Sequence, residues 1–323
     1  MLGNISFLER SNGVTRKHDD AMNIATEQLF TNVKPQTILG RIIQFPLTRF
    51  VLVLAFLAPV SLAVMALDPG LETSTPLTKS LVAVCAAVLM YLAYCLYTRL
   101  VEKRKALEMT LKGSPAEFGK GLAIGSGLMI TIVALLAVAG CYRIDEYSFD
   151  LSLLVAAFLR LGFGAFIEEL VFRLIVFKLT EEVLGSWVAL VVQAALFGAA
   201  HIGNPNASIF SSAAIVVEAG VLLAAAFMVT RRVWLIFGLH LAWNFVQSTV
   251  FGLSVSGTTS HGIITPIVSG PEWLTGGAFG VEASWPAVGL CLAVGLLFLR
   301  RAVKGGQLAP PVWRRRRQRS FFT

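Results

Sequence analysis

Charged side chains are scarce in this sequence of 323 residues. Asp, Glu, Lys and Arg together make up 14% of it, hydrophobic residues make up 56%, and the mean hydropathy is +0.73. A soluble domain of this length needs a more polar surface, so the composition excludes that class and indicates a membrane protein with several spans. The chain also lacks internal repeats, and it has no segment typical of a second, soluble domain.

Cysteine is scarce as well. The four cysteines are Cys85, Cys95, Cys141 and Cys291. They lie within or at the edge of apolar segments and show no C-x-x-C spacing, so a cysteine metal site is not expected. The first 45 residues lack the short basic stretch followed directly by an apolar core that marks a signal peptide. We therefore expect insertion into the membrane to depend on internal spans.

Long apolar segments, in contrast, are abundant. A membrane-spanning helix needs about 20 predominantly apolar residues. Candidate segments cover residues 50–67, 80–98, 121–142, 151–177, 186–201, 209–230, 233–251 and 285–299. The sequence therefore predicts an all-α polytopic membrane bundle of about eight transmembrane helices, in which the fifth and the last are short.

The polar parts of the chain divide it into three regions. Residues 1–45 form a polar tail, residues 46–303 the membrane-embedded domain with a motif core at 150–251, and residues 304–323 a basic tail. Within the domain, two longer connections stand out. The connection at residues 99–120 is expected to be partly helical through Glu102, Lys103 and Lys105, whereas Gly, Ser, Thr and Pro disfavour helix at residues 252–284.

Basic residues explain the net charge of +8 and concentrate in four zones. These zones lie before the first span, between residues 99 and 120, at Arg231 and Arg232, and after the last span. With eight spans all four zones share one side, so both termini are expected in the cytoplasm. A basic tail beside anionic lipid is favourable. We therefore expect a lipid bilayer as the partner of these charges, and no nucleic acid.

The stretch IEELVFR, residues 167–173, places three ionisable groups inside an apolar segment. A charge at the centre of a membrane helix costs about 2.5 to 3.5 kcal/mol, so these groups must face protein or a water-filled cavity. Glu169 and Arg173 are four residues apart and can pair on one helix face. Glu168 points elsewhere, about 100° around the helix. Enzymes use such a difference in environment to give neighbouring acids different roles.

Two later segments carry polar lines on otherwise apolar helices. FGAAH places Phe197 and His201 four residues apart, and Gln193 lies one turn earlier on the same line. HLAWN places His240 and Asn244 four residues apart. Residues four apart lie on one face of a helix. We expect both lines to meet the glutamate face in the interior of the bundle.

The three stretches EELVFR, FGAAH and HLAWN occur in this order on successive predicted helices. Together they resemble the EExxxR, FxxxH and HxxxN motifs of the CPBP family of intramembrane proteases, also called the CAAX-protease and bacteriocin-processing or Abi family. The stretch SGPEWLTGGAFGVEAS, residues 269–284, resembles the loop that many bacterial members carry before their last helix. The resemblance covers residues from about 150 to 303, and none of the three motifs departs from the family pattern.

This resemblance implies an intramembrane endopeptidase. Glu168 would be the catalytic carboxylate that activates a water molecule together with His201. His240 and Asn244 would polarise the scissile carbonyl and stabilise its oxyanion. The supporting side chains would be Glu169, Arg173 and Phe197. The substrate would be a peptide or a membrane protein, in a bacterial inner membrane a leader peptide or a bacteriocin, whereas the eukaryotic relatives cut prenylated CAAX substrates.

The residue types themselves agree with this chemistry and leave the cofactor open. Peptide hydrolysis needs an activated water and a stabilised oxyanion, which carboxylate, imidazole and amide groups can supply without a metal. A zinc ion held by Glu168, His201 and His240, with an open position for water, also fits. The H-E-x-x-H pattern of zinc proteases is absent. The sequence thus allows either no cofactor or zinc.

Other functions and other residues stay open at this point. The same fold could serve as a non-proteolytic immunity or scaffold protein, or as a proton-coupled transporter whose carboxylates and histidines relay protons. A transporter would be expected to show repeats or broken helices in matching halves, and none is found in the sequence. Arg160 and Glu218 are also charged and within spans. Arg160 could pair with a carboxylate, and Glu218 could face the cavity. Gly162 and Gly164 are predicted to let a neighbouring helix approach closely.

Overall fold

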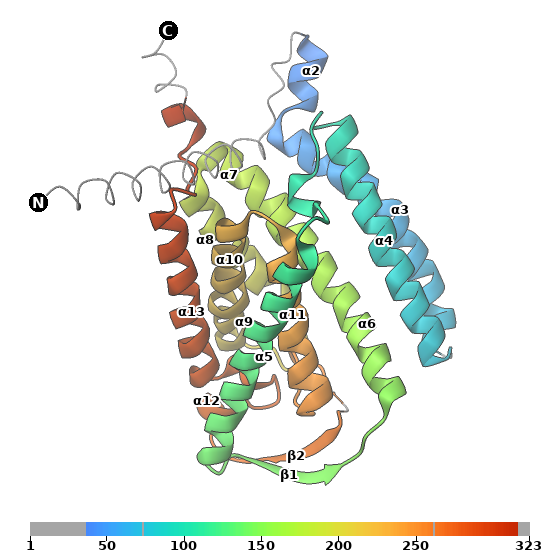
Figure 1. Cartoon of the computed structure of the whole chain (residues 1–323), viewed down its shortest axis with the longest axis vertical. Helices are drawn as coiled ribbons and strands as arrows, with labels where there is room; N and C mark the ends of the chain where they lie inside the picture. The colour runs from blue at the N-terminus through green and yellow to red at the C-terminus, as the bar shows by residue number, and fades with distance from the viewer. Residues whose placement is uncertain (1–36, 73, 261, 316–323) are drawn as a thin grey trace, which may run out of the picture.

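The computed structural model describes residues 37–72, 74–260 and 262–315. The predictions for residues 1–36 of the polar tail and residues 316–323 of the basic tail lie outside the described residues. The described chain forms a bundle of helices with one two-stranded antiparallel sheet at one end (Figure 1).

Seven helical stretches of the described chain are long and apolar enough to cross a membrane. They are α3 (Pro46–Glu72), α4 (Pro76–Leu100), α5 (Ser114–Val138), α6 (Leu151–Glu169) with η2 (Leu170–Phe177) and α7 (Lys178–Leu184), α9 (Ile209–Ile215) with η3 (Val216–Val221) and α10 (Leu222–Thr230), α11 (Val233–Phe245) with η4 (Val246–Val250), and α13 (Trp285–Lys304). The shorter apolar helix α8 (Ser186–Ala200) has 15 residues. The predicted all-α membrane bundle is confirmed. Helix α8, which corresponds to the predicted short span at residues 186–201, is below the length needed to cross a membrane.

Short polar caps fix where several helices begin. The Asp150 side chain accepts hydrogen bonds from the backbone of Ser152 and Leu153 at the start of α6. The Ser284 side chain accepts one from Ala287 at the start of α13. Such caps satisfy amides that have no partner within the helix. Both of these starts lie at the end of the bundle that carries the sheet (Figure 1).

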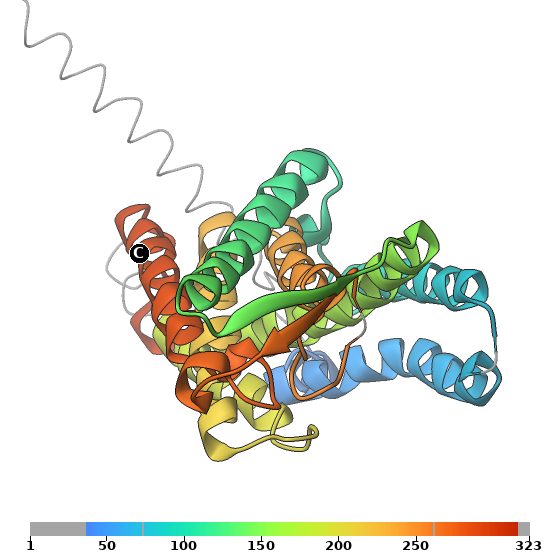
Figure 2. The same cartoon turned by 90° about the horizontal axis from the view of Figure 1, so that it is seen from below.

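The sheet joins two connections that are far apart in the sequence. Strand β1 (Tyr142–Tyr147), between α5 and α6, pairs antiparallel with β2 (Ile264–Val268) from the long connection before α13. Seen from that end, the two strands cross over the helices (Figure 2). The third span ends at Val138, earlier than predicted, because Gly140 adopts a left-handed φ of 74° and the chain turns into β1. As expected, residues 252–284 contain little helix, namely α12 (Glu272–Thr275) and η5 (Val281–Ala283).

The prediction of helix through Glu102, Lys103 and Lys105 is wrong. Helix α4 ends at Leu100, and the next helical turn, η1, covers Leu107–Met109. The physical reason is a set of buried ion pairs that the local sequence pattern does not contain. Lys103 adopts a left-handed φ of 56°, and the flanking side chains of Glu102 and Arg104 turn inward and pair with each other.

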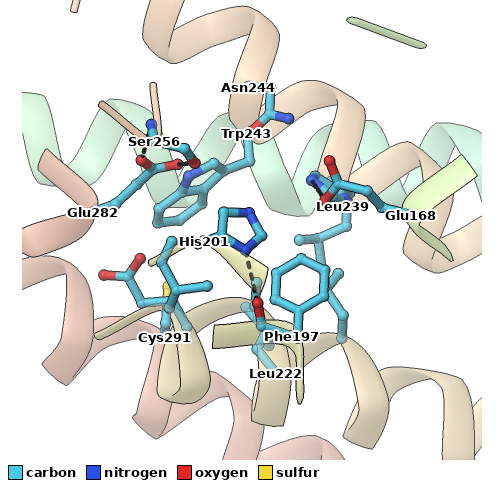
Figure 3. A pocket seen from close by; sticks show the side chains of 15 residues that line it. Glu168, Phe197, His201, Leu222, Leu239, Trp243, Asn244, Ser256, Glu282 and Cys291 are labelled. Atoms are coloured by element: carbon cyan, nitrogen blue, oxygen red, sulfur yellow. Dashed lines mark hydrogen bonds and ion pairs between the residues drawn. The ribbon is translucent and has the colours of Figure 1, made fainter. Parts of the chain in front are cut away.

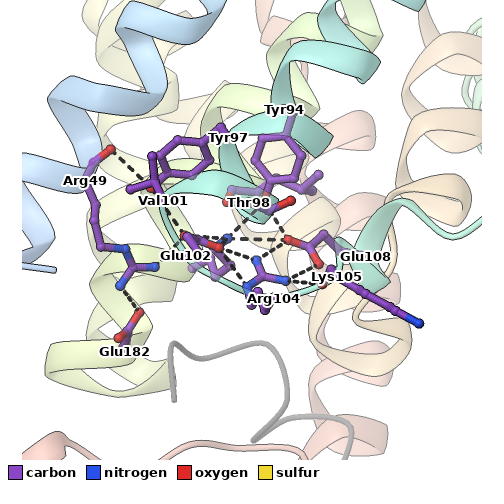
Figure 4. A network of polar contacts seen from close by, with 12 residues as sticks. Arg49, Tyr94, Tyr97, Thr98, Val101, Glu102, Arg104, Lys105, Glu108 and Glu182 are labelled. Carbon is purple, nitrogen blue, oxygen red and sulfur yellow. Dashed lines mark hydrogen bonds and ion pairs between the residues drawn. The ribbon is translucent and has the colours of Figure 1, made fainter. Parts of the chain in front are cut away.

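These ion pairs form a buried polar cluster, defined here as Arg49, Glu102, Arg104, Glu108 and Lys178 (Figure 4). It joins α3, the connection after α4, and the start of α7. Burial would raise the pKa of the Glu108 carboxyl, yet Lys178 and Arg104 hold it well below its usual range. The pKa of Glu102 is lowered by the same two cations and Arg49. Both carboxylates are therefore ionised and paired.

The four basic zones meet at the end of the bundle opposite the sheet. Arg49 pairs with Glu102, and Arg232 donates a hydrogen bond to the carbonyl of Lys112 at 2.7 Å. Arg231 donates one to the carbonyl of Gln307. Each of these contacts joins one basic zone to the next, as the predicted topology requires.

Close helix packing occurs at glycines other than the predicted ones. A Cβ atom on Gly121 of α5 would lie 2.2 Å from the carbonyl oxygen of Leu235, and one on Gly238 of α11 would lie 2.3 Å from that of Phe118. Only glycine therefore fits where α5 meets α11. Gly162 makes ordinary contact with a leucine and Gly164 faces open space, so the prediction of close approach there is wrong.

Candidate active site

A cavity in the middle of the bundle collects the side chains that the three motifs predict. Glu168 from α6, His201 from the end of α8, and His240 and Asn244 from α11 all line it. The cavity has a volume of about 40 Å³, which is room for about three water molecules. The four side chains come from three separate helices, and Figure 3 shows Glu168 and Asn244 on different sides of the His201 ring.

Glu169 holds two of the motifs together. One carboxylate oxygen of Glu169 accepts a hydrogen bond from Arg173 at 2.9 Å, which is the pairing that the spacing predicts. The same oxygen lies 2.8 Å from Nδ1 of His240. Because a carboxylate accepts hydrogen bonds, Nδ1 of His240 carries the proton and its Nε2 is turned towards the cavity. Glu169 thus fixes the orientation of a histidine on another helix, a contact that the sequence does not reveal.

Glu168 occupies a more open position than its neighbour. Its side chain is 37% exposed, whereas that of Glu169 is fully buried. One of its oxygens lies 3.7 Å from Nε2 of His240. The two adjacent glutamates therefore differ as predicted, since one is locked in an ion pair and the other faces the cavity.

His201 is oriented by its own helix and by an aromatic ring. It caps the C-terminus of α8, and its Nδ1 donates a hydrogen bond to the carbonyl of Phe197 at 2.7 Å. In the neutral ring this leaves the lone pair on Nε2. The centroids of the Phe197 and His201 rings lie 4.7 Å apart, and Cζ of Arg173 lies 4.5 Å from the centroid of the Phe197 ring. Phe197 therefore packs between the second motif and the ion pair of the first.

Three π-helical segments lie close in sequence to residues that line the cavity: η2 follows Glu169, η3 itself contributes Glu218, and η4 follows Phe245. A π-helical turn breaks the regular pattern of backbone hydrogen bonds and often occurs at functional sites. In η3, Arg173 donates a hydrogen bond to the carbonyl of Ala219 at 2.6 Å, and Gln193 donates one to that of Gly220 at 2.7 Å. Side chains of the first two motif helices thus stabilise the irregular turn.

Two further carboxyl groups line the cavity. Glu218 is the charged residue for which the sequence left a role open, and Glu282 was not predicted. Glu282 lies in η5, within the stretch that resembles the family loop, so the loop resemblance was the available signal. Arg160 does not line this cavity and instead borders a separate depression between α4 and α6. Among the described residues that line the cavity, none is Lys or Arg.

The predicted zinc ligands do not fit a metal as they lie here. In the described part of the chain, no group of three or more His, Cys, Asp or Glu side chains has an arrangement that could hold a metal ion. Nδ1 of each histidine is engaged, by Phe197 or by Glu169, so only the two Nε2 atoms are available to the cavity. We therefore assign no chemistry to a metal in this site.

The fold and the motif helices define an integral membrane protein with the features of an intramembrane protease. Comparison with protein families agrees, because residues 150–246 match the model described as Rce1-like, type II CAAX prenyl endopeptidase. This segment is thus a CAAX-protease-type domain of the CPBP family, as the three motifs indicated. No curated protein and no solved structure matches the chain. The match supports intramembrane endopeptidase activity in general.

Proposed function

We propose that the chain hydrolyses a peptide bond within this cavity, using Glu168 and His201 to activate water and His240 and Asn244 to stabilise the oxyanion. The observation that carries the proposal is that these four side chains, from three helices, line one small cavity. The substrate is a peptide or a membrane-associated protein segment that enters in extended form.

The proposed first step is attack of water on the scissile carbonyl carbon. Glu168 faces the cavity, and Nε2 of His201 has the free lone pair, because Nδ1 of His201 donates to Phe197. One of these bases takes a proton from the water as its oxygen forms the new C–O bond. The same proton then passes to the leaving nitrogen when the C–N bond breaks. The products are a carboxylic acid and an amine, and the acid then gives its proton to the amine, which leaves a carboxylate and an ammonium group.

The proposed oxyanion contacts come from α11. Because Glu169 engages Nδ1 of His240, Nε2 is the ring nitrogen that faces the cavity, and it is a donor when the ring is an imidazolium. The amide of Asn244 has two further N–H donors. Fixed donors at the position of developing negative charge are often the largest contribution to catalysis of acyl transfer. Glu169 and Arg173 are assigned supporting roles, as is Phe197.

The cellular setting is also proposed. Seven apolar helices support an integral membrane protein, and the four basic zones lie together at one end of it. The positive-inside rule then places that end, with both termini, in the cytoplasm. We assign the protein to a bacterial inner membrane, with leader peptides, bacteriocins or membrane proteins as substrates.

A cleavage assay with matched variants tests the proposal. Wild type, Glu168→Gln and His240→Ala are purified in detergent and incubated with a peptide library, and products are identified by mass spectrometry. Glu272→Gln is the matched control, since Glu272 is an exposed carboxylate outside the cavity. We expect cleavage by wild type and the control only. Equal cleavage by all four proteins, or cleavage by none, would contradict the proposal.

A further inference from the structure

Glu218 is a buried acid without the partners that other buried acids in this protein have. Among the described residues six glutamates are buried, namely Glu102, Glu108, Glu169, Glu181, Glu218 and Glu282. The first four each form an ion pair with Arg or Lys. Glu218 and Glu282 form none with the described residues, although each is only 3% exposed. These two are the buried glutamates that line the cavity without belonging to a motif.

The environment of Glu218 leaves one of its carboxyl oxygens without a hydrogen-bond donor. Its Oε1 atom is fully buried and accepts no hydrogen bond from any described residue. Leaving a buried polar atom unsatisfied is costly. The residue lies in the π-helical segment η3, whose irregular turn is itself stabilised by Arg173 and Gln193. The fold thus maintains this carboxyl at the cavity wall at a cost in stability.

Glu282 reaches the same wall from the connection before α13. It accepts hydrogen bonds from the backbone N–H of Ser256 at 2.5 Å and from the Ser256 hydroxyl at 3.4 Å. The Trp243 indole provides a further hydrogen bond. Glu282 interacts electrostatically with Glu218. In Figure 3, Glu282 and Glu168 lie on opposite sides of the His201 ring. The wall therefore carries two neighbouring carboxyls, with one of them held in place.

Such a pair needs a cation or a shared proton. A carboxylate only accepts hydrogen bonds, whereas a primary ammonium has three donors and about the size of a water molecule. The cavity volume of about 40 Å³ admits groups of that size. A shared proton would satisfy only one acceptor oxygen. A primary ammonium would satisfy Glu218 and Glu282 together, at a wall where none of the described lining residues is Lys or Arg.

We propose that Glu218 and Glu282 form a subsite that binds a primary ammonium group beside the reacting peptide bond. The assignment of this group to substrate or product rests on the proposed function. The ammonium has two possible sources, a lysine side chain of the substrate or the new amino terminus that hydrolysis releases. Both present the same chemistry to the two carboxyls.

Binding is tested first without any substrate. We expect n-butylamine at pH 8 to raise the thermal unfolding midpoint of the wild-type protein in detergent, because a ligand of the native state stabilises it. n-Butanol, which lacks the charge, should not do so. The increase should be lost in Glu218→Gln and Glu282→Gln and kept in Glu272→Gln. An equal increase in wild type and Glu218→Gln would overturn the proposal, as would no increase in wild type.

Cleavage then distinguishes the two sources. If the ligand is a substrate lysine, wild type should cleave lysine peptides with a kcat/KM about 100-fold above that for norleucine peptides, and Glu218→Gln should remove this preference. If the ligand is the new amino terminus, the C-terminal product should inhibit more strongly with a free than with an acetylated amine. Amine binding without any cleavage would uphold the subsite and contradict the protease. Cleavage without amine binding, lysine preference or product inhibition would uphold the protease and contradict the subsite.

The variants are checked for folding independently. Glutamine has nearly the shape of glutamate, so Glu218→Gln is expected to keep the wild-type unfolding midpoint or raise it. Glu282→Gln provides a second test on another element. Retained lysine preference in both variants, with both folded, would also overturn the proposal.

Discussion

Nδ1 of His240 lies 2.8 Å from a carboxylate oxygen of Glu169, and that oxygen also accepts the hydrogen bond from Arg173. A histidine from the third motif is thus oriented by an ion pair from the first. The contact joins α6 to α11 at the depth of the cavity. It makes Glu169 a positioning residue whose substitution should change both stability and catalysis.

Glu169→Gln is therefore expected to have two effects. It leaves Arg173 buried without a countercharge, which should lower the free energy of unfolding by about 3 to 5 kcal/mol. It also removes the anion that orients His240, which should lower kcat by about 10²- to 10⁴-fold by analogy with buried orienting carboxylates. Unfolding in detergent and steady-state kinetics measure the two effects. The double variant with Arg173→Met should regain stability but not activity; recovery of both would refute the orienting role.

Phe197→Leu tests the ring that packs against His201. The substitution keeps an apolar side chain but removes the aromatic face that contacts His201 and the Arg173 guanidinium. We expect a loss of about 1 to 2 kcal/mol in stability and a fall in kcat, with KM little changed. Phe172→Leu is the control, because the Phe172 ring packs on the Phe197 ring, whereas it is the Phe197 ring that packs on His201. Equal kcat values for the two variants would show that the ring does not position His201.

The stability of the protein should depend on pH through Glu282. Burial raises the pKa of this carboxyl to about 7 despite hydrogen bonds from Ser256 and Trp243, and Glu218 and His240 also face it. Between an unfolded pKa of 4.5 and about 7, the folded protein binds more protons at this site. Stability therefore falls as pH rises through this range, by on the order of 3 kcal/mol. Unfolding midpoints measured from pH 5 to 8 should fall less for Glu282→Gln than for the wild type. Identical pH profiles for the two proteins would contradict the role of Glu282.

The buried polar cluster should respond to pH in the opposite direction. The pKa values of Glu102 and Glu108 are lowered by Lys178 and Arg104, so their pairing stabilises the fold above the unfolded pKa. This contribution is lost as pH falls below about 4.5 towards the folded values. Lys178→Met should cost about 3 to 5 kcal/mol at pH 7 and less at pH 4, measured by unfolding in detergent. Lys304→Met, at an exposed position, is the control and should cost little at either pH.

Metal chelation tests the remaining alternative for the cofactor. Because Glu168, His201 and His240 do not form a metal-binding arrangement here, we expect 1,10-phenanthroline to leave cleavage unchanged. Elemental analysis of the purified protein should find zinc well below one ion per chain. Stoichiometric zinc that is lost together with activity would show that the ligands rearrange around a metal.

The sequence predicted features that depend on local spacing. Helix positions followed from apolar length, and the Glu169–Arg173 pair followed from helical periodicity. The convergence of Glu168, His201 and His240 was predicted because buried polar groups in a membrane protein must face one another or water. Each of these arguments needs only the composition of one segment.

Features that depend on contacts between distant segments could not be predicted from local sequence patterns. Glu102 leaves the helical pattern because its partners are Arg49 and Lys178, which lie on other helices. The close approach at Gly238 depends on the facing backbone of α5, not on a glycine motif. Glu282 looked like a residue of a polar connection, and only the path of that connection over the bundle brings it to the cavity. The π-helical turns likewise depend on tertiary partners for their backbone atoms.

Because η3 is an irregular turn, the function of this span depends on the exact number of residues that it contains. Removing one residue from Val216–Val221 would let the helix become regular, and the side chains and carbonyls within this segment would point in other directions, although the flanking helix keeps its register. Glu218 would then face a different neighbour, and the carbonyls that Arg173 and Gln193 engage would be withdrawn into the helix. Deletion of one residue from η3 should therefore abolish the proposed activity, although no motif residue is changed. The same deletion in a connection outside the membrane should be tolerated.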